Sequence, residues 1–286
     1  RDGDFVTIPA ERGPRRNIRR KGEDVVAGTT ILRRGERLTG ARLALASAQH
    51  LAVLPVYRRV RVALFSSGDE LRAAGETIGA GQIGDANRPM LRSLLAGMGC
   101  EVVDRGILRD DPEQQIAALM AAAMDCDLIV TSGGASVGEE DHLTNVIRRR
   151  GHLEVWRLKI KPGKPVGIGD IDDCPILALP GNPVAAAMNC LMLGTPLVGA
   201  LSGARDLLPR TLRLPLAATI AKRPGRWEAL LGHYADAPGR PTGVAPEAKT
   251  GSAMLSSLAA ADGFITLPEP IGQAHAGDPV DFVPLR

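Results

Sequence analysis

The stretch Asp127-Leu128-Ile129-Val130-Thr131-Ser132-Gly133-Gly134 is the part of this 286-residue chain that decides its fold. Its first half is continuously apolar and too short for an amphipathic helix, which is typical of a buried strand in a parallel sheet. Its second half opens the glycine-rich loop Ser132 to Gly138. A second apolar run, Pro175 to Leu179, leads into Pro180-Gly181-Asn182-Pro183. Because open α/β sheets bind ligands at the carboxyl ends of their strands, both loops predict a binding site.

Strands and helices alternate on both sides of this stretch. Strands are expected at 60–65, 101–107, 127–130, around 166–168 and at 175–179, and helices at 88–98, 112–124, 142–150 and 183–200. This order predicts parallel βαβ units with right-handed crossovers. Asp111-Pro112 and Asn182-Pro183 each combine a predicted capping side chain with proline at the first helical position, which indicates two helix starts.

The two flanks of this region have a different pattern. Residues 1–58 are rich in turns, with one alanine-rich helix expected at 41–52, and the start of the chain resembles a turn entering a strand more than a natural N-terminus. Short β-like runs follow residue 203, at 211–216, 226–234, 263–267 and 280–283. We therefore predict an α/β fold class with a partial N-terminal β-rich domain at 1–58, a three-layer α/β domain at 59–203 and a small C-terminal β-barrel domain at 204–286.

Composition limits the classes of function. The chain is 44% hydrophobic with a formal net charge of +3, which is mild and does not indicate a nucleic-acid partner. No uninterrupted apolar stretch near the roughly 20 residues of a membrane span and no leader are evident, so no membrane partner and a cytoplasmic location are predicted. The basic run Arg12 to Lys21 is either a solvated loop or an anion-binding patch.

The cysteines and histidines do not form metal-binding patterns. The four cysteines lie far apart, without a Cys-x-x-Cys pair, so each is predicted to be a small buried hydrophobic residue. The five histidines are scattered, without the spacing of a transition-metal site.

The loops carry the chemistry of an anion site. Glycines in Ser132 to Gly138 allow backbone N–H groups to approach an anion, although a plain strand-to-helix turn is also often rich in glycine. Lys161-Pro162-Gly163-Lys164-Pro165 places two ammonium groups on a stiff loop, which favours phosphate binding. Asp85 and Asn87 could also serve only as turn and cap residues. The predicted ligand-binding residues are Ser66, Ser67, Gly68, Asp69, Asp85, Asn87, Ser132, Gly133, Gly134, Ser136, Gly138, Lys161, Gly163, Lys164, Pro180, Gly181, Asn182 and Pro183.

Three aspartates are candidates for acid, base or metal chemistry. They are Asp24, Asp111 and Asp141. Carboxylates that face phosphates usually hold a divalent cation between them, which makes Asp111 and Asp141 the candidate metal ligands. Asp111 is also explained as a helix cap, Asp141 adjoins the glycine loop, and Asp24 has no partner evident in the sequence.

Six motifs in order resemble the molybdopterin molybdenumtransferase family, which comprises the bacterial MoeA proteins and the related E domains of gephyrin and its plant counterpart. The motifs lie at residues 17–24, 66–71, 85–87, 131–141, 160–165 and 179–184. The resemblance implies insertion of molybdate into adenylylated molybdopterin with release of AMP, assisted by Mg²⁺. It also implies a homodimer, and a molybdopterin adenylyltransferase is a further expected partner.

By position, Asp24, Asp111 and Asp141 match acidic residues that the family uses around its active site, and Lys161 and Lys164 match its anion-binding lysines. The family's N-terminal Ala-Met-Asp-Gly-Tyr-like motif is absent from this sequence, so the resemblance does not imply activity for this stretch alone. Smaller departures are Ser67, Ala135 and Arg157, which replace threonine, valine and lysine. Two alternatives stay open: a molybdopterin adenylyltransferase-like enzyme, and a non-catalytic molybdopterin-binding scaffold.

Overall fold

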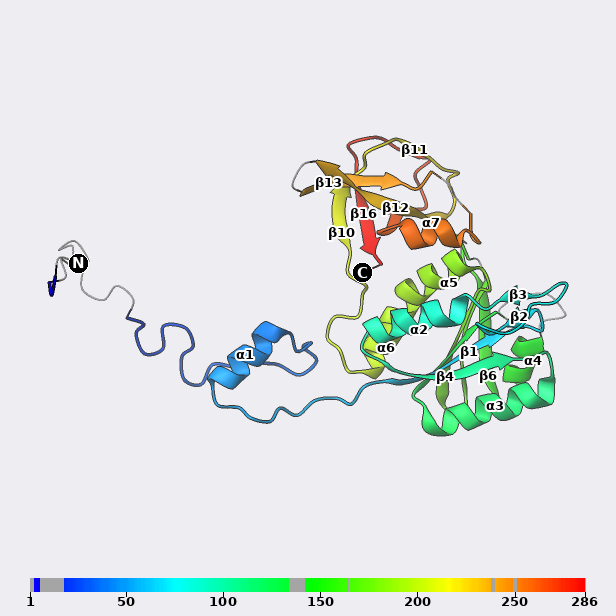
Figure 1. Cartoon of the computed structure of the whole chain (residues 1–286), viewed down its shortest axis with the longest axis horizontal. Coiled ribbons are helices and arrows are strands. Elements are labelled where there is room, and N and C mark those ends of the chain that lie inside the picture. The colour runs from blue at the N-terminus through cyan, green and yellow to red at the C-terminus, as the bar shows by residue number, and fades with distance from the viewer. Residues whose placement is uncertain are drawn as a thin grey trace. The chain divides into compact units, whose positions relative to one another are not determined.

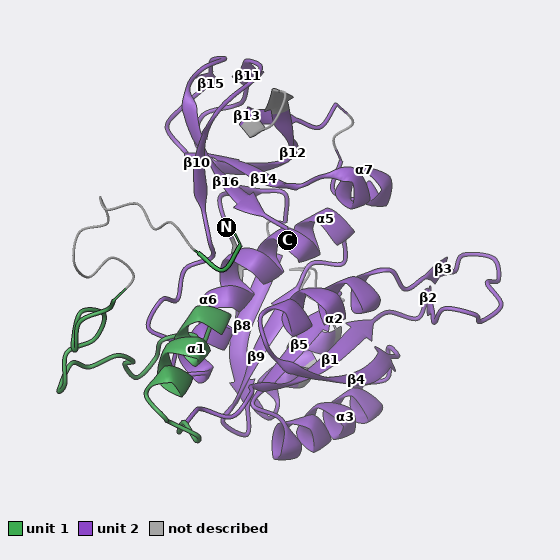
Figure 2. Cartoon of the chain, turned by 60° about the vertical axis from the view of Figure 1, so that its left-hand side comes forward, with its two compact units in different colours: residues 1–55 green, residues 56–286 purple. Residues whose placement is uncertain are grey.

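The structure is a computed structural model that describes residues 3–5, 18–133, 142–163, 165–237, 240–248 and 251–285. The chain divides into two compact units, Arg1–Pro55 and Val56–Arg286, coloured separately in Figure 2. In the first unit, α1 (Gly40–Ala48) starts at Thr39, whose hydroxyl accepts a hydrogen bond from the Arg42 amide at 3.4 Å. The helix is shorter than predicted because His50 has a φ of 60°, in the left-handed region.

The second unit is built on a six-stranded sheet with the order β4-β1-β5-β9-β8-β6. Its first four strands are parallel, as predicted. The strands are β1 (Arg61–Ser67), β4 (Glu101–Leu108), β5 (Leu128–Ser132), β9 (Cys174–Leu179), β8 (Pro165–Ile171) and β6 (Gly151–Arg157).

The other end of this sheet corrects the prediction of parallel units throughout. Strand β8 is antiparallel to both β9 and β6, and β6 was not predicted at all. Asp172 and Asp173, with φ of 47° and 66°, form the tight connection between β8 and β9. Two consecutive residues with positive φ are typical of a type I′ hairpin turn, which forces the strands it joins to run antiparallel.

Helices cover both faces of the sheet (Figure 1). Side chains of β1 alternate between the two cores: Ala63 and Phe65 pack with α3 and α4, and Val62 and Leu64 pack with α2 and α6. The helices are α2 (Asn87–Gly97), α3 (Pro112–Asp125), α4 (His142–Arg148), α5 (Pro183–Asn189) and α6 (Thr195–Leu201). The predicted α/β fold class is confirmed.

The last two helices form one continuous helical stretch through the π-helical segment η1 (Cys190–Gly194). Within the described residues, Pro183–Leu201 is the one helix long and apolar enough, by length and composition, to cross a membrane. The sequence-based statement that no such stretch exists is therefore wrong. Half of this helix is buried inside the protein, and Cys190 and Val198 pack against the sheet, as in the core helix of a folded domain.

All four cysteines are buried and free, which confirms their predicted role as small hydrophobic residues. Burial raises the pKa of Cys100 and Cys174 to about 11 and that of Cys190 to about 12. Thiols with such values are protonated at neutral pH and therefore unreactive.

A second sheet follows in the C-terminal part, with the order β10-β16-β14-β12-β13 and with β7 pairing β12 off this path. Strand β13 and helix α7 were not predicted. The elements of this part are β10 (Leu212–Pro215), β12 (Trp227–Ala237), β13 (Arg240–Pro246), β14 (Gly263–Leu267), β16 (Pro279–Pro284) and α7 (Leu255–Ala260), and its short strands β11 (Ile220–Ala221) and β15 (Gln273–Ala274) pair with each other. Strand β7 (Ile160–Lys161) comes from the α/β part, where the short strands β2 (Leu71–Arg72) and β3 (Ile83–Gly84) also pair.

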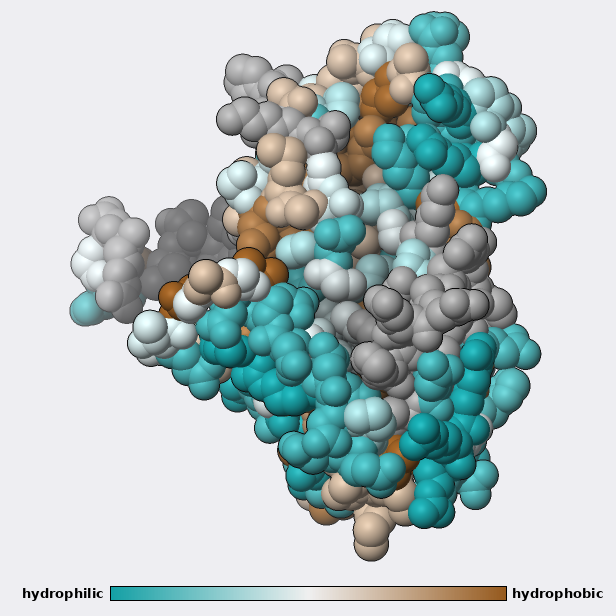
Figure 3. Space-filling model, turned by 90° about the vertical axis from the view of Figure 1, so that its right-hand side faces the viewer, coloured by the Kyte–Doolittle hydropathy of each residue, from teal (hydrophilic) through white to brown (hydrophobic). Residues whose placement is uncertain are grey.

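A hydrophobic cluster joins this second sheet to the α/β part of the same unit. Met188 of α5 packs with Leu231 of β12, Leu258 of α7 and Phe264 of β14. On the face drawn in Figure 3, hydrophilic residues predominate over much of the surface. The predicted boundaries after residues 58 and 203 stay a prediction.

Candidate functional site

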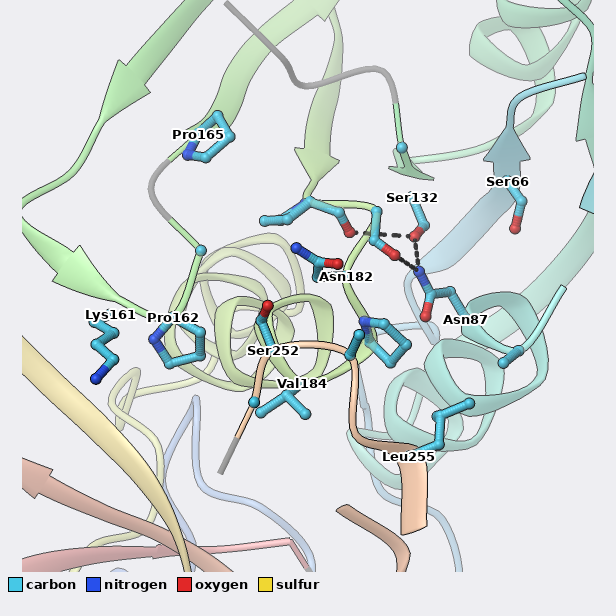
Figure 4. A pocket seen from close by; sticks show the side chains of 18 of the residues that line it. Ser66, Asn87, Ser132, Lys161, Pro162, Pro165, Asn182, Val184, Ser252 and Leu255 are labelled. Carbon is cyan, nitrogen blue, oxygen red and sulfur yellow. Dashed lines mark hydrogen bonds between the residues drawn. The ribbon is translucent and has the colours of Figure 1, made fainter. Parts of the chain in front are cut away.

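A cavity of about 1060 Å³ lies in the second unit, where the carboxyl ends of β1, β5 and β9 face residues of the C-terminal sheet (Figure 4). This is the edge of the sheet that the strand-loop pattern predicted for ligand binding. The predicted residues that line the cavity are Ser66, Ser67, Asp85, Asn87, Ser132, Gly133, Lys161, Gly163, Pro180, Gly181, Asn182 and Pro183.

Other predicted residues lie elsewhere. Gly68 and Asp69 fasten the loop after β1 to the neighbouring strand end: the Gly68 amide donates to the Leu108 carbonyl at 3.1 Å, and the Asp69 carboxylate accepts from the Asp110 amide at 3.2 Å. Asp24 belongs to the first unit, where it pairs with Arg19 at 3.5 Å. Asp111 caps α3 and does not line the cavity. Gly134, Ser136, Gly138, Asp141 and Lys164 lie outside the described residues.

Asp85 connects the end of β1 to the start of α2. Its carboxylate accepts hydrogen bonds from the Ser66 hydroxyl at 3.0 Å, the Arg88 amide at 3.2 Å and the Arg88 Nε at 2.8 Å. The Arg88 guanidinium in turn donates to Asp104 at 2.6 Å. With a side chain only 2% exposed, Asp85 is a buried charge that these partners neutralise. It therefore holds the cavity wall in place.

Asn87 links three loops of the cavity (Figure 4). Its amide nitrogen donates to the Ser132 hydroxyl at 2.8 Å and to the Gly181 carbonyl at 2.6 Å, and the Ser132 hydroxyl donates to the Pro180 carbonyl at 3.4 Å. The helix α2, strand β5 and the loop after β9 are thus fixed together. The sequence alone left a turn or cap role open for Asn87, but the N-cap of α2 is Ala86.

The glycine-rich loop begins with a close backbone approach. Gly133 has a φ of 91°, and a Cβ atom there would lie 2.6 Å from the carbonyl oxygen of Ser67. Its amide donates to the Leu179 carbonyl at 3.1 Å. Only glycine satisfies both the positive φ and this contact, which brings the ends of β1, β5 and β9 together.

The lysine loop is packed equally tightly on the other side of the cavity. Gly163 has a φ of 86°, and a Cβ there would lie 2.5 Å from the Asn189 amide nitrogen and 2.9 Å from the Ala185 Cβ. The Lys161 side chain is 57% exposed, and its ammonium lies 3.5 Å from the Glu228 carboxylate. One lysine of the predicted pair is therefore placed at the cavity.

Asn182 corrects the predicted helix cap. It occupies the N-cap position of α5, but its side chain makes no capping hydrogen bond. The Val184 amide, which such a cap could bind, donates instead to the Ser252 carbonyl at 3.1 Å. The Asn182 side chain instead lines the cavity (Figure 4).

Sequence reasoning missed the C-terminal wall of the cavity, to which Arg226, Glu228, Ser252 and Leu255 contribute. No local motif indicates them, because the fold brings them to the site from a part of the chain far from the predicted loops. One signal was available: Glu228 interrupts an apolar strand, and an acidic residue in such a position is rarely buried unless it is paired.

The described residues do not assemble a magnesium site. Within them, no group of three or more His, Cys, Asp or Glu side chains could hold a metal ion. Of the two predicted ligands, Asp141 lies outside the described residues. Asp111 accepts from the Glu113 and Gln114 amides at 3.0 and 3.1 Å and from the Gln114 side chain at 2.7 Å.

Known families match both parts of the second unit. Residues 63–200 match a family model described as a probable molybdopterin binding domain, and residues 213–285 match the MoeA C-terminal region (domain IV). The molybdopterin molybdenumtransferase of Haemophilus influenzae is 35% identical over 98% of this chain and 70% of its own length. Molybdopterin molybdenumtransferase 2 of Mycobacterium tuberculosis is 36% identical over 96% of this chain and 68% of its own length.

A solved structure is similar over most of the chain. The molybdopterin biosynthesis MoeA protein from Pyrococcus horikoshii superposes with a TM-score of 0.77 at 30% identity, covering 93% of this chain and 64% of that chain. The chain thus spans about two thirds of the length of these proteins.

Proposed function

This chain belongs to the molybdopterin molybdenumtransferase (MoeA) family, and we propose that its cavity binds adenylylated molybdopterin for the insertion of molybdate with release of AMP. The family and the transferase class predicted from the six sequence motifs are confirmed by relatives of that name. The complete reaction is part of the proposal, because the chain spans about two thirds of the length of the proteins it matches.

The observation that carries the proposal is the convergence of three strand-end loops and a lysine loop on one cavity. Its volume of about 1060 Å³ is at the upper end of small-molecule sites, which suits a nucleotide-sized ligand. Lys161 and Arg226 supply positive charge for phosphate groups, and Ser252 supplies a hydroxyl. Val184 and Leu255 supply apolar surface for a ring system.

The roles proposed for the protein are binding and electrostatic positioning. The sulfur ligands that receive the molybdenum belong to the pterin substrate, so the chain need only hold the two reactants in contact and stabilise the charge that develops. Backbone N–H groups and cations bind the oxyanions, while the hydrogen bonds of Asn87 and Asp85 keep the loops in one geometry. Proximity of this kind lowers the barrier because the reactants no longer lose their translational freedom during the reaction.

Several finer expectations stay proposals. A homodimer and a molybdopterin adenylyltransferase partner are implied by the resemblance, assistance by Mg²⁺ by the resemblance and by the predicted carboxylates, and a cytoplasmic location by the composition of the sequence. The catalytic roles of Asp24, Asp111 and Asp141 likewise stay predictions.

The reaction is tested by incubating the intact natural protein with adenylylated molybdopterin, with and without molybdate, and measuring AMP. We expect AMP release that depends on molybdate. No AMP release here, together with formation of adenylylated molybdopterin and pyrophosphate from molybdopterin and ATP, would favour the adenylyltransferase-like alternative. Binding of the pterin without any molybdate-dependent turnover would favour the scaffold alternative.

The anion site is tested by replacing Lys161 and Lys164 with alanine together. We expect pterin affinity at low salt to fall by about tenfold or more, because each lysine would make a charge-assisted hydrogen bond to phosphate. The matched control replaces Arg205 and Arg210, two exposed cations that do not line the cavity. Equal affinity losses in both double variants would indicate a general charge effect and contradict the site.

A further inference from the structure

Glu228 is a buried carboxylate in the C-terminal wall of the cavity. The residue is 3% exposed and lies in β12 between Trp227 and Ala229. Its Oε1 accepts from the Arg226 Nε at 2.7 Å, and its Oε2 lies 3.5 Å from the Lys161 ammonium. Each oxygen therefore has its own cation, and both cations line the cavity.

The backbone fixes this ion pair. Strand β7 pairs in parallel with β12 and places Lys161 opposite Glu228, and the Trp227 amide donates to the Lys159 carbonyl at 2.8 Å. Residues opposite each other in a ladder project to the same face of the sheet. On the other side of β12, Glu228 is opposite Leu267 of β14, so its strand lies between two neighbours. The carboxylate therefore has a rigid base.

From this arrangement we propose that Glu228 is a positioning residue, which holds the Lys161 ammonium at the cavity wall where it meets the phosphate of the substrate. The inference rests on the proposed function and deepens it, because it makes the C-terminal sheet part of the anion site. Lys161 has a flexible four-carbon stem and is more than half exposed. Without an anchor, its side chain would lose more conformational freedom when an anion binds.

Simple electrostatics gives the opposite expectation, which makes the proposal testable. Glu228 is a negative charge beside an anion site, so its removal alone should strengthen anion binding. Two cations and one carboxylate give this cluster a net charge of +1, and Glu228→Gln would raise it to +2. A positioning role requires anion binding to weaken in spite of the added positive charge.

The experiment is a double-mutant cycle with Glu228→Gln and Lys161→Met in the intact natural protein. Affinity for inorganic pyrophosphate is measured by calorimetry at low salt, and molybdate-dependent AMP release is measured in parallel. We expect Glu228→Gln to weaken pyrophosphate binding by about tenfold. We expect little further loss when the same change is made in the Lys161→Met protein.

Two results would overturn the proposal. The first is unchanged or tighter pyrophosphate binding by Glu228→Gln. The second is a loss of the same size in the Lys161→Met background, which would mean that Glu228 acts independently of Lys161. If the wild type shows no molybdate-dependent AMP release, the proposed function fails, while the pyrophosphate cycle still decides the role of Glu228.

Two further variants complete the test. Asp281→Asn removes a carboxylate of the same sheet that is paired with Arg213 at 2.8 Å, is 48% exposed and does not line the cavity. It should leave pyrophosphate affinity unchanged. Glu228→Asp keeps the charge but withdraws it by one methylene, so its affinity should lie between those of wild type and Glu228→Gln. If Glu228→Gln does not fold, the same cycle is run with Glu228→Asp. A loss of pyrophosphate affinity that is as large in the Lys161→Met background as in the wild type then contradicts the proposal.

Discussion

Asp111 was predicted both as a helix cap and as a catalytic, metal-binding residue. Its carboxylate accepts the Gln114 and Glu113 amides and the Gln114 side chain at the start of α3. These hydrogen bonds, that of the Gln114 amide first, lower the pKa of the carboxyl group, because they favour its charged form over the opposing effect of desolvation. We expect Asp111→Asn to keep wild-type stability at neutral pH, because asparagine is an equivalent cap, and Asp111→Ala to reduce stability.

The lowered pKa also fixes the direction of the pH dependence. A carboxyl group with a lower pKa in the folded state stabilises the fold above its unfolded value of about 3.9 and loses this contribution as pH falls through the folded value. Wild type and Asp111→Asn should therefore unfold at the same urea concentration at neutral pH, with the wild type becoming less stable than the variant in acid. AMP release by the same variant tests the predicted catalytic role: full turnover would contradict it.

The same sequence pattern gave one correct cap and one wrong one. Asp111-Pro112 and Asn182-Pro183 both indicated a helix start, and a helix begins at each proline. Only Asp111 caps with its side chain, whereas the Val184 amide of α5 has the Ser252 carbonyl as its partner. A dipeptide therefore predicts the helix start, but the partner of each N–H depends on residues far along the chain.

Among the elements, the loop after β5 depends on one close approach, which Gly133→Ala would disturb. Gly99 provides a matched control, because its φ of 95° is close to the 91° of Gly133 but its Cβ would have no neighbour within 4 Å. Both changes should lower the free energy of unfolding by roughly 1–2 kcal/mol, because a left-handed backbone is unfavourable for alanine. Only Gly133→Ala should lower it further, because its Cβ would displace Ser67. Urea unfolding compares the two, and equal losses of stability would show that the close contact has no cost.

Elements that depend on the local sequence were predicted, and features that depend on distant residues or on a turn conformation were not. Strands β1, β5 and β9 were predicted because each contains a short apolar run, and β4 was predicted from its place in the alternation of strands and helices. The antiparallel direction of β8 depends on the turn conformation of Asp172 and Asp173, which the sequence pattern did not indicate. The predicted strand-end loops do reach one cavity, but Arg226 and Glu228 reach it only through the pairing of β7 with β12, which links distant parts of the chain.

On the scale of the whole second unit, the cavity exists only while its two sheets stay together. The Met188 cluster described above holds α5 against the C-terminal sheet, and Met188 is 1% exposed. Because this core spans both parts, we expect residues 56–286 to unfold in a single transition. Far-UV circular dichroism and the fluorescence of Trp227, recorded in a Trp156→Phe background, should give the same urea midpoint.

Truncation of this shared core tests the coupling directly. Met188→Ala should lower the free energy of unfolding by about 2–5 kcal/mol, because it removes buried apolar volume and leaves a cavity, and both probes should shift together. Met124→Ala is the matched control, since Met124 of α3 is 90% exposed and such surface changes stay within about 0.5 kcal/mol. A Trp227 transition that precedes the loss of circular dichroism would mean that the C-terminal sheet detaches first. In that event the α/β part could stay folded without Arg226 and Glu228 in place, and anion binding should disappear at the first transition.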